Sequence, residues 1–123
     1  MTMRGVRGAT VVDQDRPEDV LAATRELLES LLAANPGLYP EDVASIFFTV
    51  TGDIHSTYPA LAARQMGWVH VPLLCAREID VPDSLPRCIR VLLHWNTDRP
   101  QTAVQHVYLG QAAVLRPDLS GER

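Results

Sequence analysis

Residues 88–95 constrain the fold more than any other stretch of this chain. Their sequence, CIRVLLHW, is short and apolar apart from Arg90 and His94, which predicts a β-strand. Because side chains alternate along a strand, Arg90 and His94 would share one face with Leu92. The opposite face would carry only large apolar side chains: Ile89, Val91, Leu93 and Trp95. A strand with such a face is stable only when another layer covers it.

Two predicted helices can supply that layer. The longer one is expected to begin near Pro17 and to end at residues 35–37, an Asn-Pro-Gly sequence. Its apolar stripe recurs at helical spacing and consists of Val20, Leu21, Leu27, Leu28, Leu31 and Leu32. The shorter helix is expected to begin at Pro59, with Ser56 or Thr57 as its cap.

Further strands are predicted at residues 3–10, 44–51, 69–75 and 106–109, the third of them broken by Pro72, and a loop is predicted at 76–87. The 44–51 strand is apolar on both faces, so we expect it to be a buried central strand. This order of elements predicts the α+β class, with a mixed β-sheet that helices cover on one face. Oligomerisation would cover the open edges and the remaining apolar face of such a sheet.

The composition favours one globular domain spanning residues 1–123. A net charge of −4 and a pI near 5.4 argue against a nucleic-acid or an anionic-membrane partner. No apolar stretch is long enough to span a bilayer. The two cysteines, Cys75 and Cys88, suit a reducing compartment, so a cytoplasmic location is expected.

The cationic side chains exclude several kinds of chemistry, because all eleven are arginines and lysine is absent. A Schiff-base lysine, a P-loop lysine and a Ser–Lys pair are therefore ruled out. The four histidines have neither HxH nor HExxH spacing, so no metal site is expected. Cys75 has no recognisable activating partner, which favours a buried thiol over a nucleophile. An arginine-rich site without an obvious acid–base pair favours electrostatic catalysis over hydrolysis.

Arg7 and Arg90 lie in the interior of predicted strands, where a buried guanidinium requires an anion. For Arg90 that anion is either Glu78, in a structural ion pair, or a ligand, and the spacing favours the ion pair. Arg7, flanked by two glycines, leaves the same two interpretations open. Taken singly, Arg64 would be a solvated charge on the short helix and Arg116 a residue of the tail. Several arginines in apolar settings together predict a pocket for an anionic small molecule.

Three segments carry a resemblance to a known family. They are RGVRGATVV at residues 4–12, CAREIDVPDSLPRCIRVLLHWNT at 75–97 and HVYLGQAAVLRPDLS at 106–120. Together they make the chain similar to the single-domain chorismate mutases of the AroH class, over about residues 3–120. The resemblance implies a trimeric pseudo-α/β-barrel with an active site at each subunit interface. It also implies an isomerase that converts chorismate to prephenate, towards phenylalanine and tyrosine, by a Claisen rearrangement that needs no cofactor, metal or covalent intermediate.

The resemblance also implies roles for particular residues. Arg90 would donate to the ether oxygen of the substrate, on which negative charge grows as the carbon–oxygen bond breaks. Glu78 would bind the ring hydroxyl, with Cys75 close by. Arg7 and Tyr108 would hold a carboxylate and keep the substrate folded. The remaining expected residues line the pocket or its mouth: Tyr58, Ala60, Arg64, Leu74, Leu115 and Arg116.

The family arrangement implies that Arg7, Arg90 and Tyr108 of one subunit face Glu78 and Cys75 of a neighbour. The C-terminal tail, from about residue 112 to 123, is expected to be flexible and to order over bound ligand. Its Arg116, like Arg64, would attract the dianionic substrate.

Three positions depart from the family pattern, and all of them concern the pocket wall or entrance. Tyr58 stands where phenylalanine is frequent, Leu61 where lysine can occur, and Leu74 where some members have threonine. Two alternative functions remain at this point. One is a trimeric imine or enamine deaminase, which would release ammonia, and the other is a non-catalytic trimer that binds chorismate.

Overall fold

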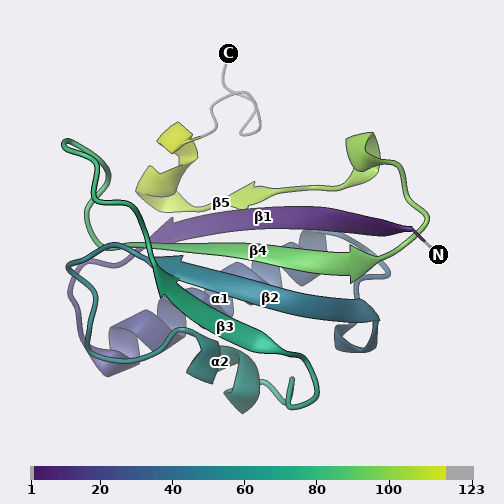
Figure 1. Ribbon diagram of the computed structural model, residues 1–123, viewed down its shortest axis with the longest axis horizontal. Helices are drawn as coiled ribbons and strands as arrows, with labels where there is room; N and C mark the ends of the chain where they lie inside the picture. Colours follow the sequence, from purple (N-terminus) through teal and green to yellow (C-terminus); the bar gives the residue numbers. More distant parts are fainter. Residues whose placement is uncertain (1, 116–123) are drawn as a thin grey trace.

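The computed structural model describes residues 2–115, which form a five-stranded sheet in the order β3-β2-β4-β1-β5 (Figure 1). The strands are β1 (Met3–Val11), β2 (Val43–Val50), β3 (Leu73–Arg77), β4 (Cys88–Asn96) and β5 (Val107–Tyr108). The central strand β4 is antiparallel to both of its neighbours, β1 and β2. The outer strands β3 and β5 run parallel to β2 and β1 respectively, so the sheet is mixed.

Two helices pack against the same face of the sheet; in Figure 1 one lies behind the sheet and the other below β3. They are α1 (Pro17–Ala34) and α2 (Ala60–Gln65). Three 3-10 helices complete the described secondary structure: η1 (Pro40–Asp42), η2 (Gln101–Ala103) and η3 (Gly110–Leu115). The prediction of an α+β fold with a mixed sheet and helices on one face is therefore confirmed.

The main core lies between the sheet and the two helices. From β4 it receives Val91, Leu93 and Trp95, while Ile89 of the same face belongs to a smaller cluster with Val12, Val20 and Ile54; all four β4 side chains are at most 2% exposed. From α1 it receives Leu27, Leu28 and Leu31 of the predicted stripe. Leu21 and Leu32 of that stripe are only half-buried, because they lie towards its margins.

The expectation that residues 44–51 form the central strand of the sheet, buried on both faces, is wrong. β2 is the second strand of the sheet, β4 occupies the centre, and Phe47 of β2 is 41% exposed. Only the alternate side chains of β2, such as Ile46 and Phe48, face the helices. The apolar residues on its other face lie on the side of the sheet opposite α1 and α2.

Two local predictions also differ from the structure. The strand expected at 69–75 begins only after Pro72 and continues to Arg77, because proline has no N–H to donate to a neighbouring strand. The carbonyl of Pro72 still accepts the N–H of Ile46. Neither Ser56 nor Thr57 caps α2, whose N-cap residue is Pro59. The backbone N–H of Ser56 donates instead to the carboxylate of Asp15.

Candidate active site

The face of the sheet opposite α1 and α2, which we call the helix-free face although the short η3 packs at its β5 side, carries two neighbouring rows of side chains that cross the strands. Strand register places Tyr108, Ala9, Arg90 and Thr49 in the first row. The second row contains Arg7, Leu92, Phe47 and Leu74. Because side chains two apart on a strand share a face, these rows bring Arg7 and Arg90 onto one surface. The sheet itself therefore brings Arg7, Arg90 and Tyr108 onto one face.

Arg90 lies beside Glu78, which follows the end of β3. The Nε atom of Arg90 is 3.6 Å from Oε2 of Glu78, and both side chains are 26% exposed. That separation is an ion pair but is too long for a hydrogen bond. Among the described residues the buried Nε of Arg90 has no hydrogen-bond partner. The expected ion pair thus exists, yet it leaves a guanidinium donor unused.

Thr49 of β2 holds the carboxylate of Glu78 in place. Its hydroxyl donates a 2.7 Å hydrogen bond to Oε2 of Glu78, the oxygen that also faces Arg90. The backbone N–H of Glu78 donates to the carbonyl of Val50 at 2.8 Å. Sequence reasoning missed Thr49, whose only signal is a hydroxyl side chain within the apolar run ASIFFTVT.

Tyr108 and Leu115 lie at the β5 side of the same face. Both pack against a small buried cluster of Ala9, Cys88 and Ala112. The hydroxyl oxygen of Tyr108 is buried and, within residues 2–115, has no hydrogen-bond partner. A buried hydroxyl without a partner is costly, which is typical of a group that a ligand completes. Arg116, expected at the mouth of the site, lies outside the described residues.

A hollow of about 370 Å³ opens on this face. Its lining includes three charged side chains, those of Arg7, Glu78 and Arg90. Phe47 and Leu92 supply apolar walls. Two guanidinium groups against one carboxylate leave a net positive charge, which suits an anionic ligand.

The other expected residues lie in a second hollow, of about 480 Å³, between α2 and β3. It is lined by Tyr58, Ala60, Leu61, Arg64, Leu73, Leu74 and Cys75. The two hollows share no lining residue. Within one chain the structure therefore divides the expected site residues into two separate groups.

The division also corrects one expectation about subunits. The resemblance assigns Glu78 to a neighbour of the subunit that provides Arg90, but Glu78 of the same chain already forms the 3.6 Å ion pair. The strand register places the end of β3 level with the first residues of β4, across β2, and sequence spacing does not reveal that proximity. Cys75, in contrast, lies in the second hollow, away from Arg90.

The thiols of both cysteines are free. Burial raises the pKa of Cys75, and the opposing effects of the Ala60 backbone N–H and the Arg64 charge do not cancel it. Burial likewise raises the pKa of Cys88. Both thiols are therefore protonated near neutral pH. Cys75 lines its hollow as a neutral thiol and is not a thiolate nucleophile.

The described part of the chain contains no group of three or more side chains that could hold a metal ion. None of its helices combines the length and apolar character that crossing a membrane requires. The fold and the hollows thus describe an anion-binding site built from arginines, a carboxylate, hydroxyls and apolar walls.

Comparison with known proteins shows which class of enzyme has this site. The family model of chorismate mutase type I matches residues 3–119. The chain is 57% identical to the chorismate mutase AroH of Thermus thermophilus over 117 residues, which is 95% of this chain and 96% of that protein. It is 46% identical to the chorismate mutase AroH of Bacillus subtilis over 121 residues, 98% of this chain and 94% of that protein.

A solved structure, that of a chorismate mutase from Clostridium thermocellum, has the same fold. The TM-score is 0.87 at 46% sequence identity, and the match covers 89% of this chain and 97% of that one. The chain belongs to the chorismate mutase type I family. Its activity is that of a chorismate mutase, an isomerase of aromatic amino acid biosynthesis that acts on chorismate and forms prephenate. The deaminase alternative is therefore set aside.

Proposed function

We propose that the protein catalyses the rearrangement of chorismate by holding its folded conformer and by placing Arg90 beside the ether oxygen. In this reaction the ether carbon–oxygen bond breaks while a carbon–carbon bond forms within the same molecule, so no group is transferred to the protein. Holding the reactive conformer removes an entropic cost from the chemical step. The cation at Arg90 stabilises the oxygen more strongly as charge develops on it than in the ground state.

The unused Nε donor of Arg90 is the observation that carries this proposal. It is buried on the wall of a hollow and lies 3.6 Å from Glu78, too far for a hydrogen bond. A bound ether oxygen would supply the missing acceptor. Glu78 would then accept the ring hydroxyl of the substrate, while Arg7 and Tyr108 would bind a carboxylate.

We further propose that the active protein is a trimer with a site at each subunit interface, in a pseudo-α/β-barrel arrangement, and that it acts in the cytoplasm without a cofactor. The helix-free face exposes three large apolar side chains, Phe47, Leu74 and Leu92, which another subunit would cover. The hollow of one subunit that contains Arg90 would be completed by the Tyr58–Cys75 hollow of the next. Two free thiols suit a reducing compartment.

The test of the catalytic role is the chorismate consumption of Arg90 variants. Arg90→Ala should lower kcat by about 10²–10³-fold or more, because it removes a full charge from the transition state. Arg90→Lys should fail as well, since an ammonium group does not reproduce the planar guanidinium. A variant Arg90→Ala with the rate of the unmodified protein would exclude this mechanism.

The interface proposal has its own test, the mixing of two inactive variants. Arg90→Ala removes the catalytic cation from the Arg90 hollow of its own subunit. Leu74→Arg blocks the Tyr58–Cys75 hollow of its own subunit with a large side chain. Every mixed trimer would contain one site in which both halves are intact, so co-refolded subunits should regain activity that neither variant has alone. If each site lay within one subunit, mixing would restore nothing.

A further inference from the structure

The segment 79–87, which connects Glu78 to β4, is attached to the molecule chiefly at its two ends. At one end the N–H of Glu78 donates to Val50, and at the other the N–H of Thr51 donates to Cys88 at 3.1 Å. Between these points, residues 79–84 are all exposed. Their only backbone bonds in the described structure are local, from Val81 to the Ile79 carbonyl and from Ser84 to the Val81 carbonyl. The loop itself therefore does little to determine where β4 begins.

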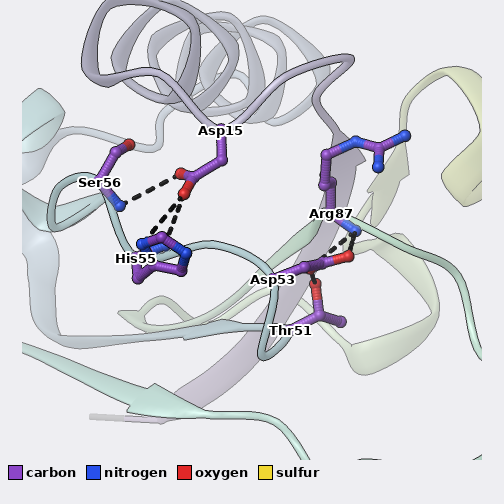
Figure 2. A network of polar contacts seen from close by, with 6 residues as sticks. All are labelled: Asp15, Thr51, Asp53, His55, Ser56 and Arg87. Atoms are coloured by element: carbon purple, nitrogen blue, oxygen red, sulfur yellow. Dashed lines mark hydrogen bonds and ion pairs between the residues drawn. The ribbon is translucent and has the colours of Figure 1, made fainter.

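Two side chains that follow β2 hold the start of β4, together with the backbone N–H of Val12, which donates to the carbonyl of Arg87 at 3.0 Å. Both carboxylate oxygens of Asp53 accept the backbone N–H of Arg87, at 3.0 and 2.9 Å. The hydroxyl of Thr51 donates to Oδ1 of Asp53 at 2.6 Å and accepts the N–H of Cys88 at 2.9 Å. Figure 2 shows Asp53 between Thr51 and Arg87. We call Thr51 and Asp53 the β4 clamp.

The clamp replaces bonds that the strand ladder does not make. Arg87 has a left-handed backbone, with φ of 46°, a strained conformation for a residue with a side chain. Its N–H is paired by Asp53, and its guanidinium Nε donates to the carbonyl of Val12 at 2.9 Å. Although burial alone would raise the pKa of Asp53, hydrogen bonds from Thr51 and Arg87 lower it, so the clamp carboxylate is ionised at neutral pH.

Arg90 lies close to this point of attachment and itself pairs with Ala9 of β1 and Thr49 of β2. Arg90 lies three residues beyond Arg87 and pairs with Thr49, two residues before Thr51. The clamp and the Arg90 row are thus adjacent on the same two strands. Because a shift of about 1 Å at a catalytic group can cost about 10²-fold in rate, the attachment of β4 affects catalysis as well as stability.

We infer that Thr51 and Asp53 are positioning residues for the reaction. By holding the backbone of Arg87 and Cys88, they fix the position of the Arg90 side chain relative to Glu78. This inference rests on the catalytic role proposed for Arg90. It assigns the two residues no contact with substrate. Their effect is expected mainly in kcat, because Arg90 acts on charge that develops only in the transition state.

The first experiment compares Thr51→Val with Thr51→Ser. Valine has nearly the shape of threonine but removes both hydroxyl bonds, whereas serine keeps them. Thr51→Val should lower kcat about tenfold to hundredfold with a smaller change in KM, and Thr51→Ser should stay near the unmodified rate. The matched control is Thr24→Val, which removes a buried hydroxyl bond within α1, to the carbonyl of Val20, and should lower stability but not kcat. All rates are measured well below each variant's unfolding temperature and at equal oligomeric state.

A second pair covers the case in which Thr51→Val does not fold. Asp53 is exposed, so Asp53→Ala and Asp53→Asn should both fold. Alanine removes both acceptors and should lower kcat more than asparagine, which keeps one oxygen for Arg87. Asp53→Ala should also have little further effect in an Arg90→Lys background, because the group that it positions is already changed.

The outcomes separate the two proposals. If Arg90→Ala keeps full activity, the catalytic role of Arg90 fails, whatever the clamp does. If Arg90→Ala loses activity while Thr51→Val or Asp53→Ala keeps kcat within twofold of the unmodified protein, the positioning role alone is overturned. Equal kcat losses in Thr51→Val and Thr24→Val would also overturn it, because they would indicate a general effect of lower stability.

Discussion

Arg90 Nε lies 3.6 Å from Oε2 of Glu78, and the same carboxylate oxygen accepts a 2.7 Å hydrogen bond from Thr49. The hydroxyl of Thr49 therefore holds the carboxylate of Glu78, and Arg90 lies too far from it to form a hydrogen bond. This arrangement keeps the guanidinium close to an anion in the free protein without using its Nε donor. A buried cation that is already fully hydrogen-bonded would have to lose those bonds before it could bind a substrate oxygen.

Thr49 is expected to matter through the orientation of Glu78. Thr49→Val removes the 2.7 Å bond and frees the carboxylate to move onto Arg90, so KM for chorismate should rise severalfold. Thr49→Ser keeps a hydroxyl and should behave like the unmodified protein. Steady-state kinetics of the two variants check the prediction, and equal KM values would contradict it.

Asn35 is expected to be important for stability, because it is fully buried and joins the end of α1 to the segment before β5. Its amide nitrogen donates to the carbonyls of Leu31 and Gln105, both at 2.9 Å, and its oxygen accepts the N–H of Gln105 at 2.8 Å. Asn35→Ala leaves buried groups unpaired and should cost about 1–3 kcal/mol in the free energy of unfolding. Urea denaturation measures this loss. A surface change at the nearby exposed Gln101 to alanine should leave the midpoint unchanged.

Asp53 is expected to make the free energy of unfolding depend on pH under acidic conditions. Its folded-state pKa is lowered from the ordinary 3.8, because the hydrogen bonds from Thr51 and Arg87 outweigh the effect of burial. The contribution of its carboxylate is complete above the unfolded pKa and is lost as the pH falls through the folded pKa. The stability difference between the unmodified protein and Asp53→Asn should therefore be constant from pH 7 to about 5 and shrink below pH 3.8. Unfolding titrations at several pH values test this, and a difference that grows with acid would refute it.

Cys75 is expected to react slowly with alkylating agents at neutral pH. Burial raises its pKa above the ordinary 9.0, and only the thiolate is nucleophilic. The alkylation rate should therefore continue to rise beyond pH 9, and Cys75→Ala should abolish it. Cys88, 1% exposed, should react only after denaturation. A rate plateau reached near pH 7 would mean that Cys75 is a stabilised thiolate.

The strands and helices were predictable because their signals are local. The alternation of Ile89, Val91 and Leu93 with Arg90 and Leu92 expresses the two-residue period of a strand, and the structure buries one set and not the other. The failures were also local in origin. β3 begins after Pro72 rather than before it, and the N-cap residue of α2 is Pro59 rather than Ser56 or Thr57.

The site was only partly predictable from the chain. The resemblance named Arg90 and Glu78, but the donor that holds Glu78, Thr49, comes from a different strand and has no motif of its own. The clamp residues Thr51 and Asp53 were missed for the same reason. Each bonds to a segment 34 to 37 residues further along the chain.

The sequence by itself determined which side chains share a face of β4, where the charges lie along the chain, and the family to which the motifs point. These properties depend on periodicity and residue chemistry within short segments. Only the tertiary structure decided that Arg90 pairs in register with Ala9 and Thr49, and that Glu78 of the same chain lies beside it. Register depends on contacts between strands far apart in sequence, and a slip of one residue would turn Arg90 towards the apolar core.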